Sequence, residues 1–527
     1  MTVLARQAPF SPLAMFSIGI SGLIALPLLY VGYSAVTSEP AIWQRLWTTR
    51  IPELCLNTVS LAIGVGLATL LLGVSLAWFI TRYQFWGRPF WEWAFVLPLA
   101  IPSYVLAYVY TFLLDTGGPF EQAWQALVGP DARLFSPYSF VGALIVMTLN
   151  TFPYVYLLSR TALQNFNTTY EEAALATGAS PWATIYRVFL PLIRPALVAG
   201  LFLVVLYVVS DFGAVSLLRF QTFTYAVYQQ ITGRYDYGAA SILSLLLVTF
   251  ALIFLLGERW FRRQSRFYQT SGKVRPSSPI PCRWPQSALL TGYFLVVFGL
   301  AFALPAYWLI HWTNSAWADH EIGSGFLTYV WNSIMLSGGA ATLALVLGTP
   351  LAYLACRRPT PLNMTCLQGA YTGYVLPGPV AALALLMVFS SVPWLYGTAL
   401  VLMLAYLIHF LPAGLQSMES AIQQVNPNLE EAAKSLGARS FQAFQRVTFP
   451  LVRGGFLVAW ILMFLQCMKE LPATLLLRPV GFDTLAVRIW LEASEELYQL
   501  AAPPALLIVI MTIPVVLLLS RKNWQVA

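Results

Sequence analysis

Twelve windows of mostly apolar residues, each long enough to cross a lipid bilayer as an α-helix, divide this chain. They cover approximately residues 13–33, 54–80, 92–114, 138–158, 192–215, 240–257, 288–310, 332–355, 370–391, 396–415, 451–475 and 502–519. Hydrophobic residues make up 58% of the sequence and charged residues only 9%, whereas an ordinary soluble domain is about 25% charged. A soluble fold cannot bury that much apolar surface, so the sequence predicts an all-α membrane protein with about 12 transmembrane helices.

The net charge of +8 follows the expected membrane topology. If the N-terminus is cytoplasmic and the sides alternate at each window, most of the 29 Lys and Arg residues fall on the cytoplasmic side. The densest basic cluster comprises Arg259, Arg262, Arg263, Arg266, Lys273, Arg275 and Arg283. Topology and anionic membrane lipid explain this cluster, so nucleic acid is not an expected partner. We expect a multi-pass protein of the cytoplasmic membrane with both termini cytoplasmic and its first window retained as a helix.

The two halves of the chain match each other, and each contains six windows. Matched residues stand 275 positions apart early in the halves, 279 apart at a Val-Leu-Pro sequence and 259 apart after the fourth window. Examples are Asn57 with Asn332, Arg82 with Arg357, Pro98 with Pro377, and Asp211 with Glu470. The offset changes because the second half lacks most of the external loop 115–138. An even number of windows gives both halves the same orientation, which predicts a parallel duplication.

This duplication predicts three segments. Residues 1–257 are expected to form the first six-helix repeat, 258–287 a basic cytoplasmic linker, and 288–527 the second six-helix repeat. The external loops are expected to form an outer docking surface; they are 115–138, 211–238, 311–326 and 478–499.

A polar helical hairpin occurs in both halves with the same internal spacing, at about residues 165–191 and 424–450. The shared positions are Glu171, Glu172, Ala173, Ala174, Gly178 and Pro191 in the first copy, and Glu430, Glu431, Ala432, Ala433, Gly437 and Pro450 in the second. Acids suit the first turn of a helix, alanines give a slim body that another protein can approach, and glycine ends the helix. A loop that only connects two spans would not keep this spacing. The two copies therefore predict two identical docking sites for a partner with two-fold symmetry.

Prolines interrupt the third window of each half, at Pro98 and Pro102 and again at Pro377 and Pro379. Broken helices in transporters present backbone groups to a passing solute. Ordinary helix kinks are the alternative, because prolines are common in membrane helices. His409 is expected to pack or to accompany a kink.

Two equivalent acids, Asp211 and Glu470, lie near the external ends of their windows. Acids at membrane depth are costly and usually face a cavity, and hard cations prefer oxygen ligands. The candidates for the translocation path are Asp211, Lys469, Glu470, Pro98 and Pro377. Alternatively, the acids cap helices or pair with Lys469, Arg219 or Arg478. No metal site is assigned, because the external group His311, Asp319, His320 and Glu321 matches no tight ligand set.

The hairpins resemble the cytoplasmic-loop motif of binding-protein-dependent ABC importer permeases. That motif reads Glu-Ala-Ala, three residues, Gly, nine residues, an aliphatic residue, one residue and Leu-Pro. Val188 and Val447 stand where the motif usually has Ile, and Phe449 replaces Leu. The resemblance implies two tandem importer-type permease repeats, with each hairpin seated on one of two copies of a cytoplasmic ATPase subunit, and an extracytoplasmic substrate-binding protein.

ATP chemistry is expected on a separate chain, because this sequence contains no G-x-x-x-x-G-K-[ST] loop. We therefore expect a transport subunit that is not an enzyme and binds no cofactor, with ATP and Mg used by the partner ATPase. An ion-coupled secondary transporter would also explain twelve spans, but not two matching hairpins.

Several stretches are similar to ferric-iron importer permeases in particular; they are residues 97–104, 210–214, 469–479 and 481–486. The fused arrangement of two repeats is also typical of that group. The resemblance implies ferric iron as the substrate. Thiamine permeases share the fused layout, and polyamine, sulfate and phosphonate permeases share the motif, so these substrates remain alternatives.

Overall fold

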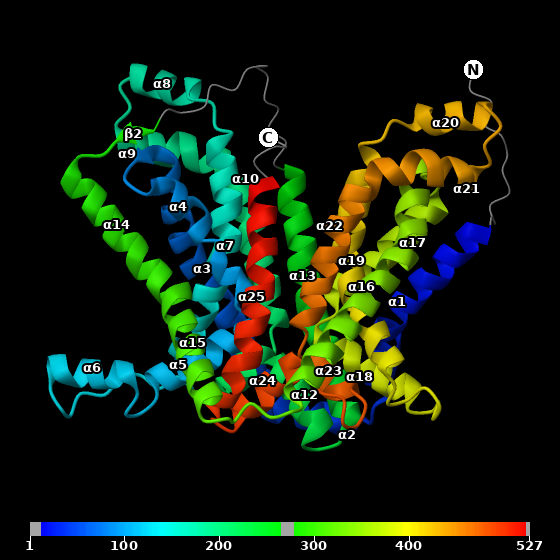
Figure 1. Cartoon of the computed structure of the whole chain (residues 1–527), viewed down its shortest axis with the longest axis horizontal. Coiled ribbons are helices and arrows are strands. Elements are labelled where there is room, and N and C mark those ends of the chain that lie inside the picture. Colours follow the sequence, from blue (N-terminus) through cyan, green and yellow to red (C-terminus); the bar gives the residue numbers. More distant parts are fainter. Residues whose placement is uncertain (1–11, 265–278, 523–527) are drawn as a thin grey trace. The chain divides into compact units, whose positions relative to one another are not determined.

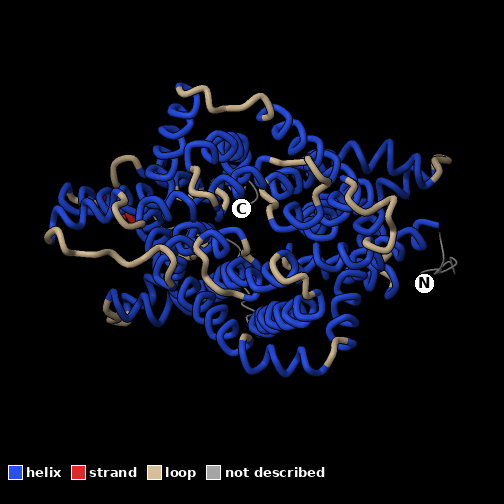
Figure 2. The backbone as a smooth tube through the Cα atoms, turned by 90° about the horizontal axis from the view of Figure 1, so that it is seen from below, coloured by secondary structure: helices blue, strands red, loops and turns tan. Residues whose placement is uncertain are grey.

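The computed structural model of the protein describes residues 12–264 and 279–522, and most of this backbone is helical (Figure 2). Ten helices are long and apolar enough to cross a membrane, and two further bent pairs bring the number to twelve in the described residues. The predicted all-α membrane fold is therefore confirmed. Residues Arg266, Lys273 and Arg275 of the predicted basic linker lie outside the described part of the chain.

The helices of the first half are α1 (Pro12–Thr37), α2 (Pro40–Thr49), α3 (Ile51–Arg82), α4 (Arg88–Ala94), η1 (Leu97–Ala100), α5 (Ser103–Leu114), α6 (Pro119–Val128), α7 (Phe140–Gln164), α8 (Thr169–Ala176), α9 (Pro181–Thr184), η2 (Ile185–Phe189), α10 (Leu190–Ser210), α11 (Gly213–Leu217), α12 (Phe223–Thr232) and α13 (Tyr237–Gln264). Those of the second half are α14 (Trp284–Phe298), η3 (Gly299–Ala303), α15 (Leu304–Ala318), α16 (Phe326–Arg357), α17 (Pro361–Ala370), η4 (Tyr371–Val375), α18 (Gly378–Phe389), α19 (Ala399–Gln423), α20 (Pro427–Ser435), α21 (Ser440–Ala443), η5 (Phe444–Thr448), α22 (Phe449–Met468), α23 (Pro472–Leu477), α24 (Leu485–Ser494) and α25 (Tyr498–Lys522). Strands β1 (Tyr83–Gln84) and β2 (Ile280–Pro281) form one short parallel pair.

The chain forms two compact units, and each unit draws on both halves of the sequence. Unit 1 contains the described residues of 1–43, 227–248 and 324–488, and unit 2 contains those of 44–226, 249–323 and 489–527. In unit 1, α16, α19 and α22 pack together, and α1 packs on α16, α17 and α18. In unit 2, α3, α7 and α10 pack together, and α15 packs on α25. The compact units thus differ from the sequence repeats 1–257 and 288–527, because terminal helices join the unit of the other half.

The third window of each half is a bent span. The helices before and after the break are inclined by 93° in the first half and by 106° in the second. The breaks occur at Pro102 (φ −57°, ψ 149°) and Pro377 (φ −59°, ψ 149°), each of which immediately precedes a new helix. Because proline cannot donate a backbone hydrogen bond and holds φ near −65°, it ends one helix and starts the next.

The structure corrects one alignment made from the sequence. Pro377 corresponds to Pro102, at the early offset of 275, and not to Pro98. Pro98 lies instead inside the 3-10 turn η1. The repeated Leu-Pro sequence misled the alignment, because Ile101-Pro102 and Leu376-Pro377 are the structurally equivalent pairs.

Candidate functional site

Each predicted hairpin forms at one end of its own helix bundle (Figure 1). In unit 2, α8 and α9 lie between α7 and α10, and in unit 1, α20 and α21 lie between α19 and α22. Gly178 (φ 84°) and Gly437 (φ 91°) have the left-handed conformation that ends a helix, as the sequence predicts. Ala179 donates its backbone N–H to the carbonyl of Ala174 at 3.1 Å, which closes the first of these turns.

The first glutamate of copy one holds the hairpin to the end of α3. Arg82, the last residue of α3, donates two hydrogen bonds to the carboxylate of Glu171, one of them at 2.8 Å from Nη1 to Oε2. The guanidinium also lies over the rings of Trp78 and Phe189, at 5.4 and 5.0 Å from their centroids. Charge and aromatic contact together fix α8 to the membrane helix.

The equivalent glutamate of copy two is held by hydrogen bonds. Glu430 is only 3% exposed and accepts hydrogen bonds from Arg357 Nε (3.1 Å), the Tyr353 hydroxyl (2.7 Å) and Thr448. Burial by itself would raise the pKa of Glu430, but the hydrogen bonds from Thr448 and Tyr353 and the charge of Arg357 lower it below its ordinary value. Arg357 and Arg82 are the matched arginines of the two repeats, and no functional role was predicted for them from the sequence.

The second glutamate of each pair has a different environment. Glu172 and Glu431 are exposed, as are the alanines that follow them, Ala173 and Ala432. Ala174 and Ala433 are half-buried beneath them. Each Glu-Glu pair thus divides into an inner anchor and an outward carboxylate available to a partner.

A π turn joins each hairpin to its membrane helix. It spans η2 before α10 and η5 before α22, with Leu190 N–H donating to Ile185 O in the first copy and Phe449 N–H to Phe444 O in the second. Pro191 and Pro450 follow directly, and a proline inside a helix clashes with the carbonyl four residues earlier. The wider turn relieves that clash and leaves one continuous helical path into the membrane. These turns were not predicted from the sequence, although a Xaa-Pro pair after an unbroken helical segment is a signal for them. The π turn η3 likewise precedes Leu304-Pro305.

The two candidate acids at the outer ends of α10 and α22 are buried and act as helix caps. Asp211, 9% exposed, accepts hydrogen bonds from Ala214 N (2.9 Å) and the Ser103 hydroxyl (2.5 Å). Glu470, 8% exposed, accepts one from Ala473 N (3.2 Å). This geometry matches the capping alternative left open by the sequence. Arg219 and Arg478 do not bind these acids; they pair with Glu496 and Asp483 instead.

The neighbours of the two acids compensate for their different lengths. A Cβ atom added to Gly378 would lie 2.7 Å from Oε1 of Glu470. Ser103 occupies the equivalent first position of α5 and uses its hydroxyl to reach the shorter Asp211. The pairs Ser103–Asp211 and Gly378–Glu470 therefore fill the same space in two ways, and each ties a bent span to the end of the helix that leads from a hairpin.

Polar side chains also fix the two breaks. Asn150 donates a hydrogen bond from Nδ2 to the carbonyl of Ile101 at 2.9 Å, and His409 Nδ1 lies 2.8 Å from the carbonyl of Leu376. Asn150 and His409 are 259 residues apart and occupy matched positions. The expected kink-associated histidine is thus found at a break. Lys469 is half-buried beside Glu470, and no group of three or more His, Cys, Asp or Glu side chains in the described residues could hold a metal ion.

Comparisons with known proteins agree with this arrangement. The family described as "Binding-protein-dependent transport system inner membrane component" matches residues 69–267 and 344–521, two segments that begin 275 residues apart. The "Fe(3+)-transport system permease protein FbpB 2" of Haemophilus influenzae is 32% identical over 521 residues, which cover 97% of this chain and 98% of that protein.

The alignments to two further relatives cover a smaller share of the relative or of this chain. The "Ferric transport system permease protein FbpB" of Actinobacillus pleuropneumoniae is 25% identical over 487 residues, 87% of this chain and 69% of that protein. The "Sulfate transport system permease protein CysT" of Escherichia coli is 27% identical over 263 residues, 48% of this chain and 92% of that protein. The two matches to the family and the near full-length similarity show that this chain belongs to the binding-protein-dependent transport system inner membrane components and is a multi-pass permease subunit of an ABC importer with two fused permease repeats.

Proposed function

We propose that this permease moves ferric iron from an extracytoplasmic binding protein across the inner membrane into the cytoplasm. The observation that carries this proposal is the similarity over nearly the whole chain to a protein named as an Fe(3+)-transport permease. ATP with Mg is hydrolysed by a separate ATPase subunit, one copy on each hairpin. The hairpins and both termini face the cytoplasm, in agreement with the excess of basic residues assigned to that side.

The anchored hairpins support a mechanical route for coupling. A force on α8 passes through Glu171 and Arg82 to α3 and through η2 to α10, and α3 and α10 pack against each other. Helix α10 has 21 residues, a length of about 30 Å. Its outer end continues into Asp211, which binds Ser103 at the start of the bent-span helix α5. Movement of the hairpin therefore reaches the break at Pro102 without a flexible link.

The second repeat offers the same route with different side chains. Glu430 and Arg357 connect α20 to α16, and η5 connects α21 to α22. Beyond α22, Glu470 packs against Gly378 at the start of α18. Two equivalent transmission routes suit a pair of ATPase subunits that close together, and they supply the two-state movement that alternating access requires.

Sulfate is the second candidate substrate, because about half of the chain is similar to a sulfate permease. Asp211 and Glu470 do not discriminate between a cation and an oxyanion, because both carboxylates are buried and serve as helix caps. Thiamine, polyamine and phosphonate are further candidates from the shared motif.

Uptake into vesicles separates these substrates. The permease is reconstituted with its ATPase inside and its binding protein outside, and accumulation of ferric iron, sulfate, thiamine, a polyamine and a phosphonate is compared with and without ATP. We expect ATP-dependent uptake of ferric iron alone, lost in a Glu172→Ala/Glu431→Ala variant. ATP-dependent uptake of another solute instead would overturn ferric iron but leave the importer mechanism. Ion-gradient-driven uptake without any ATPase would overturn the coupling role of the hairpins.

A further inference from the structure

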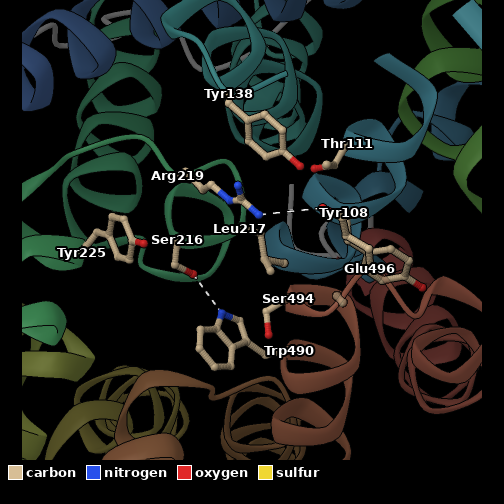
Figure 3. Close-up of a pocket in the computed structure, with 11 residues that line it drawn as sticks. Tyr108, Thr111, Tyr138, Ser216, Leu217, Arg219, Tyr225, Trp490, Ser494 and Glu496 are labelled. Carbon is tan, nitrogen blue, oxygen red and sulfur yellow. Dashed lines mark hydrogen bonds and ion pairs between the residues drawn. The ribbon is translucent and has the colours of Figure 1, made fainter. Parts of the chain in front are cut away.

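A cavity of about 190 Å³ lies inside unit 2, at the end of the unit opposite to the α8–α9 hairpin (Figures 1 and 3). Its walls come from α5, the segment before α7, the end of α11, α12 and the end of α24. Since a water molecule takes about 30 Å³ of liquid volume, the cavity has room for a small molecule or one side chain. It is larger than a single metal ion needs.

Two opposite charges line the cavity, and they are only loosely paired. Arg219 Nη2 lies 3.8 Å from Glu496 Oε1, and both side chains are more than half exposed (Figure 3). Arg478 occupies the equivalent position of the second repeat but donates a hydrogen bond to Asp483. The Arg219 side chain makes no hydrogen bond within the described residues, and its guanidinium lies 4.8 Å from the ring centroid of Tyr138. Its N–H groups are therefore available to a ligand.

The backbone holds both charged residues in an unusual conformation. Arg219 has φ 51° and Glu496 has φ 63°. Each follows the last turn of a short helix, a position where glycine is the usual residue. Arg478 has φ −61° at the matched position, so the repeat does not itself demand a positive φ. Tyr235 and His320 also have positive φ and lie outside the cavity lining, but of the two matched arginines only Arg219, which lines the cavity, bears this conformational cost.

Phenol groups supply further unused donors. Tyr108, Tyr138 and Tyr225 line the cavity, and none of their hydroxyl groups makes a hydrogen bond within the described residues. The hydroxyl of Tyr108 is buried and without a partner, but it has no surface open to the cavity, so the donors that a ligand can reach are the hydroxyls of Tyr138 and Tyr225. Burial raises the pKa of Tyr138 and outweighs the opposing charge of Arg219, so this phenol stays protonated and can donate. A ligand with several acceptor oxygens would satisfy these groups.

We propose that this cavity binds a carboxylate or another small oxyanion, with the guanidinium of Arg219 and the hydroxyls of Tyr138 and Tyr225 as donors. A guanidinium fork matches the paired oxygens of such groups. Glu496 competes with the ligand for Arg219 and, being exposed, turns toward water when the anion enters. Two sources present this chemistry: a free oxyanion outside the cell and an acidic side chain of a docked protein. The proposal does not depend on ferric iron being the transported substrate.

The first test is anion binding to the complete permease in lipid nanodiscs. Malonate and inorganic phosphate are titrated by calorimetry at constant ionic strength. Arg219→Gln should weaken binding at least tenfold, whereas Glu496→Gln should tighten it several-fold by removing the competing carboxylate. Arg133→Gln removes an exposed arginine of the same unit that does not line the cavity, and it should change affinity less than twofold.

The second test measures association of the binding protein with the same variants. If wild type binds neither anion but Arg219→Gln weakens this association at least tenfold and Glu496→Gln strengthens it, the ligand is an acidic side chain. Loss of malonate or phosphate binding in Arg219→Gln identifies a free anion. The proposal is overturned if Arg219→Gln matches Arg133→Gln in both measurements, or if Glu496→Gln weakens binding. Because the two cavity variants are expected to act in opposite directions, misfolding of one cannot imitate the result.

Discussion

Adjacent residues of the repeated motif perform different tasks. Glu171 and Glu430 are anchors that bind the terminal arginines of α3 and α16, whereas Glu172 and Glu431 are exposed. The anchors also differ between copies: aromatic rings flank Arg82, and hydroxyl groups surround Glu430. An inward anchor and an outward contact are both needed if a partner is to move the membrane helices rather than only the hairpin.

The two glutamates of copy two should separate stability from coupling. Glu430→Ala leaves Arg357 buried without its partner, so we expect the local opening free energy of α20 to fall by about 3 kcal/mol. Glu431→Ala removes an exposed side chain and should change it by less than about 0.5 kcal/mol, while it lowers ATP-driven uptake. Amide hydrogen exchange of α20 and vesicle uptake measure the two effects. Equal losses of protection in the two variants would contradict the division of roles.

The stability supplied by Glu430 should depend on pH. Its pKa in the folded protein is lower than the ordinary value of 4.5, so the folded state binds fewer protons than the unfolded state over the acidic range. The stabilisation is then fully present above about pH 4.5 and disappears as the pH falls through the lower, folded-state value. The difference in protection of α20 between wild type and Glu430→Gln should be constant near neutral pH and shrink below pH 4.5. A difference that grows with acidification would exclude this linkage.

At the scale of elements, each bent span depends on a matched pair of small and acidic residues. Gly378 leaves room for Glu470, and the Ser103 hydroxyl donates a hydrogen bond to the shorter Asp211. The π turns are a second shared element. Each connects the second helix of a hairpin to the following membrane helix without a break in the helical backbone, despite the proline at the junction. Both devices recur in both repeats, although the residues that build them differ.

Replacing the Gly378–Glu470 pair by the serine and aspartate of the first repeat tests whether the two positions are coupled. Gly378→Ser alone would place Cβ against Glu470 and Pro472, and we expect a loss of about 1–3 kcal/mol from overpacking. Glu470→Asp alone should leave a gap with an incompletely bonded carboxylate. The double variant recreates Ser103–Asp211 and should recover most of the stability, measured by thermal unfolding in nanodiscs. Additive losses in the double variant would show that the two positions are not coupled.

The π turn of copy two should depend on Pro450. Pro450→Ala restores a backbone N–H and removes the clash with the carbonyl four residues earlier, so the turn can tighten to a regular α-helix. We expect unfolding stability to be kept or slightly raised, while α21 rotates relative to α22 and ATP-driven uptake falls. Spin-label distances between α21 and α22, compared with those in wild type, report the rotation. Unchanged distances with normal uptake would contradict a role for the π turn in transmission.

At the scale of the molecule, the sequence repeats and the compact units are different divisions of one chain. Helix α1 belongs to unit 1 together with α16, α17 and α18 of the second half, and α14, α15 and α25 belong to unit 2 with the bundle of the first half. Within unit 1, helix α1 approaches α17 closely, since a Cβ atom on Gly369 would lie 2.1 Å from the Ser21 hydroxyl oxygen. Each unit is therefore incomplete without residues encoded far away in the chain.

A chain divided in the central segment should show this dependence. Residues 1–270 expressed alone lack the α14, α15 and α25 contacts of unit 2, and we expect most of this fragment to be degraded. Co-expression with residues 271–527 should restore both fragments to the membrane and allow their co-purification. Steady-state amounts on immunoblots, with the undivided chain as control, measure the effect. A first fragment that accumulates equally well alone would contradict the shared composition of the units.

Local pattern and internal repetition determined much of this protein. Apolar windows predicted its helical membrane fold because hydrophobic length is a property of contiguous residues. The hairpins with Gly178 and Gly437 were predicted from the spacing of residues that lie within a few helical turns of one another. Tertiary structure alone decided which glutamate is the anchor, that Pro102 is the partner of Pro377, that Asp211 and Glu470 cap helices, and that Arg219 meets Glu496 in a cavity. These outcomes depend on contacts between residues far apart in the chain. Two neighbouring glutamates have the same chemistry until packing turns one toward an arginine and the other toward water.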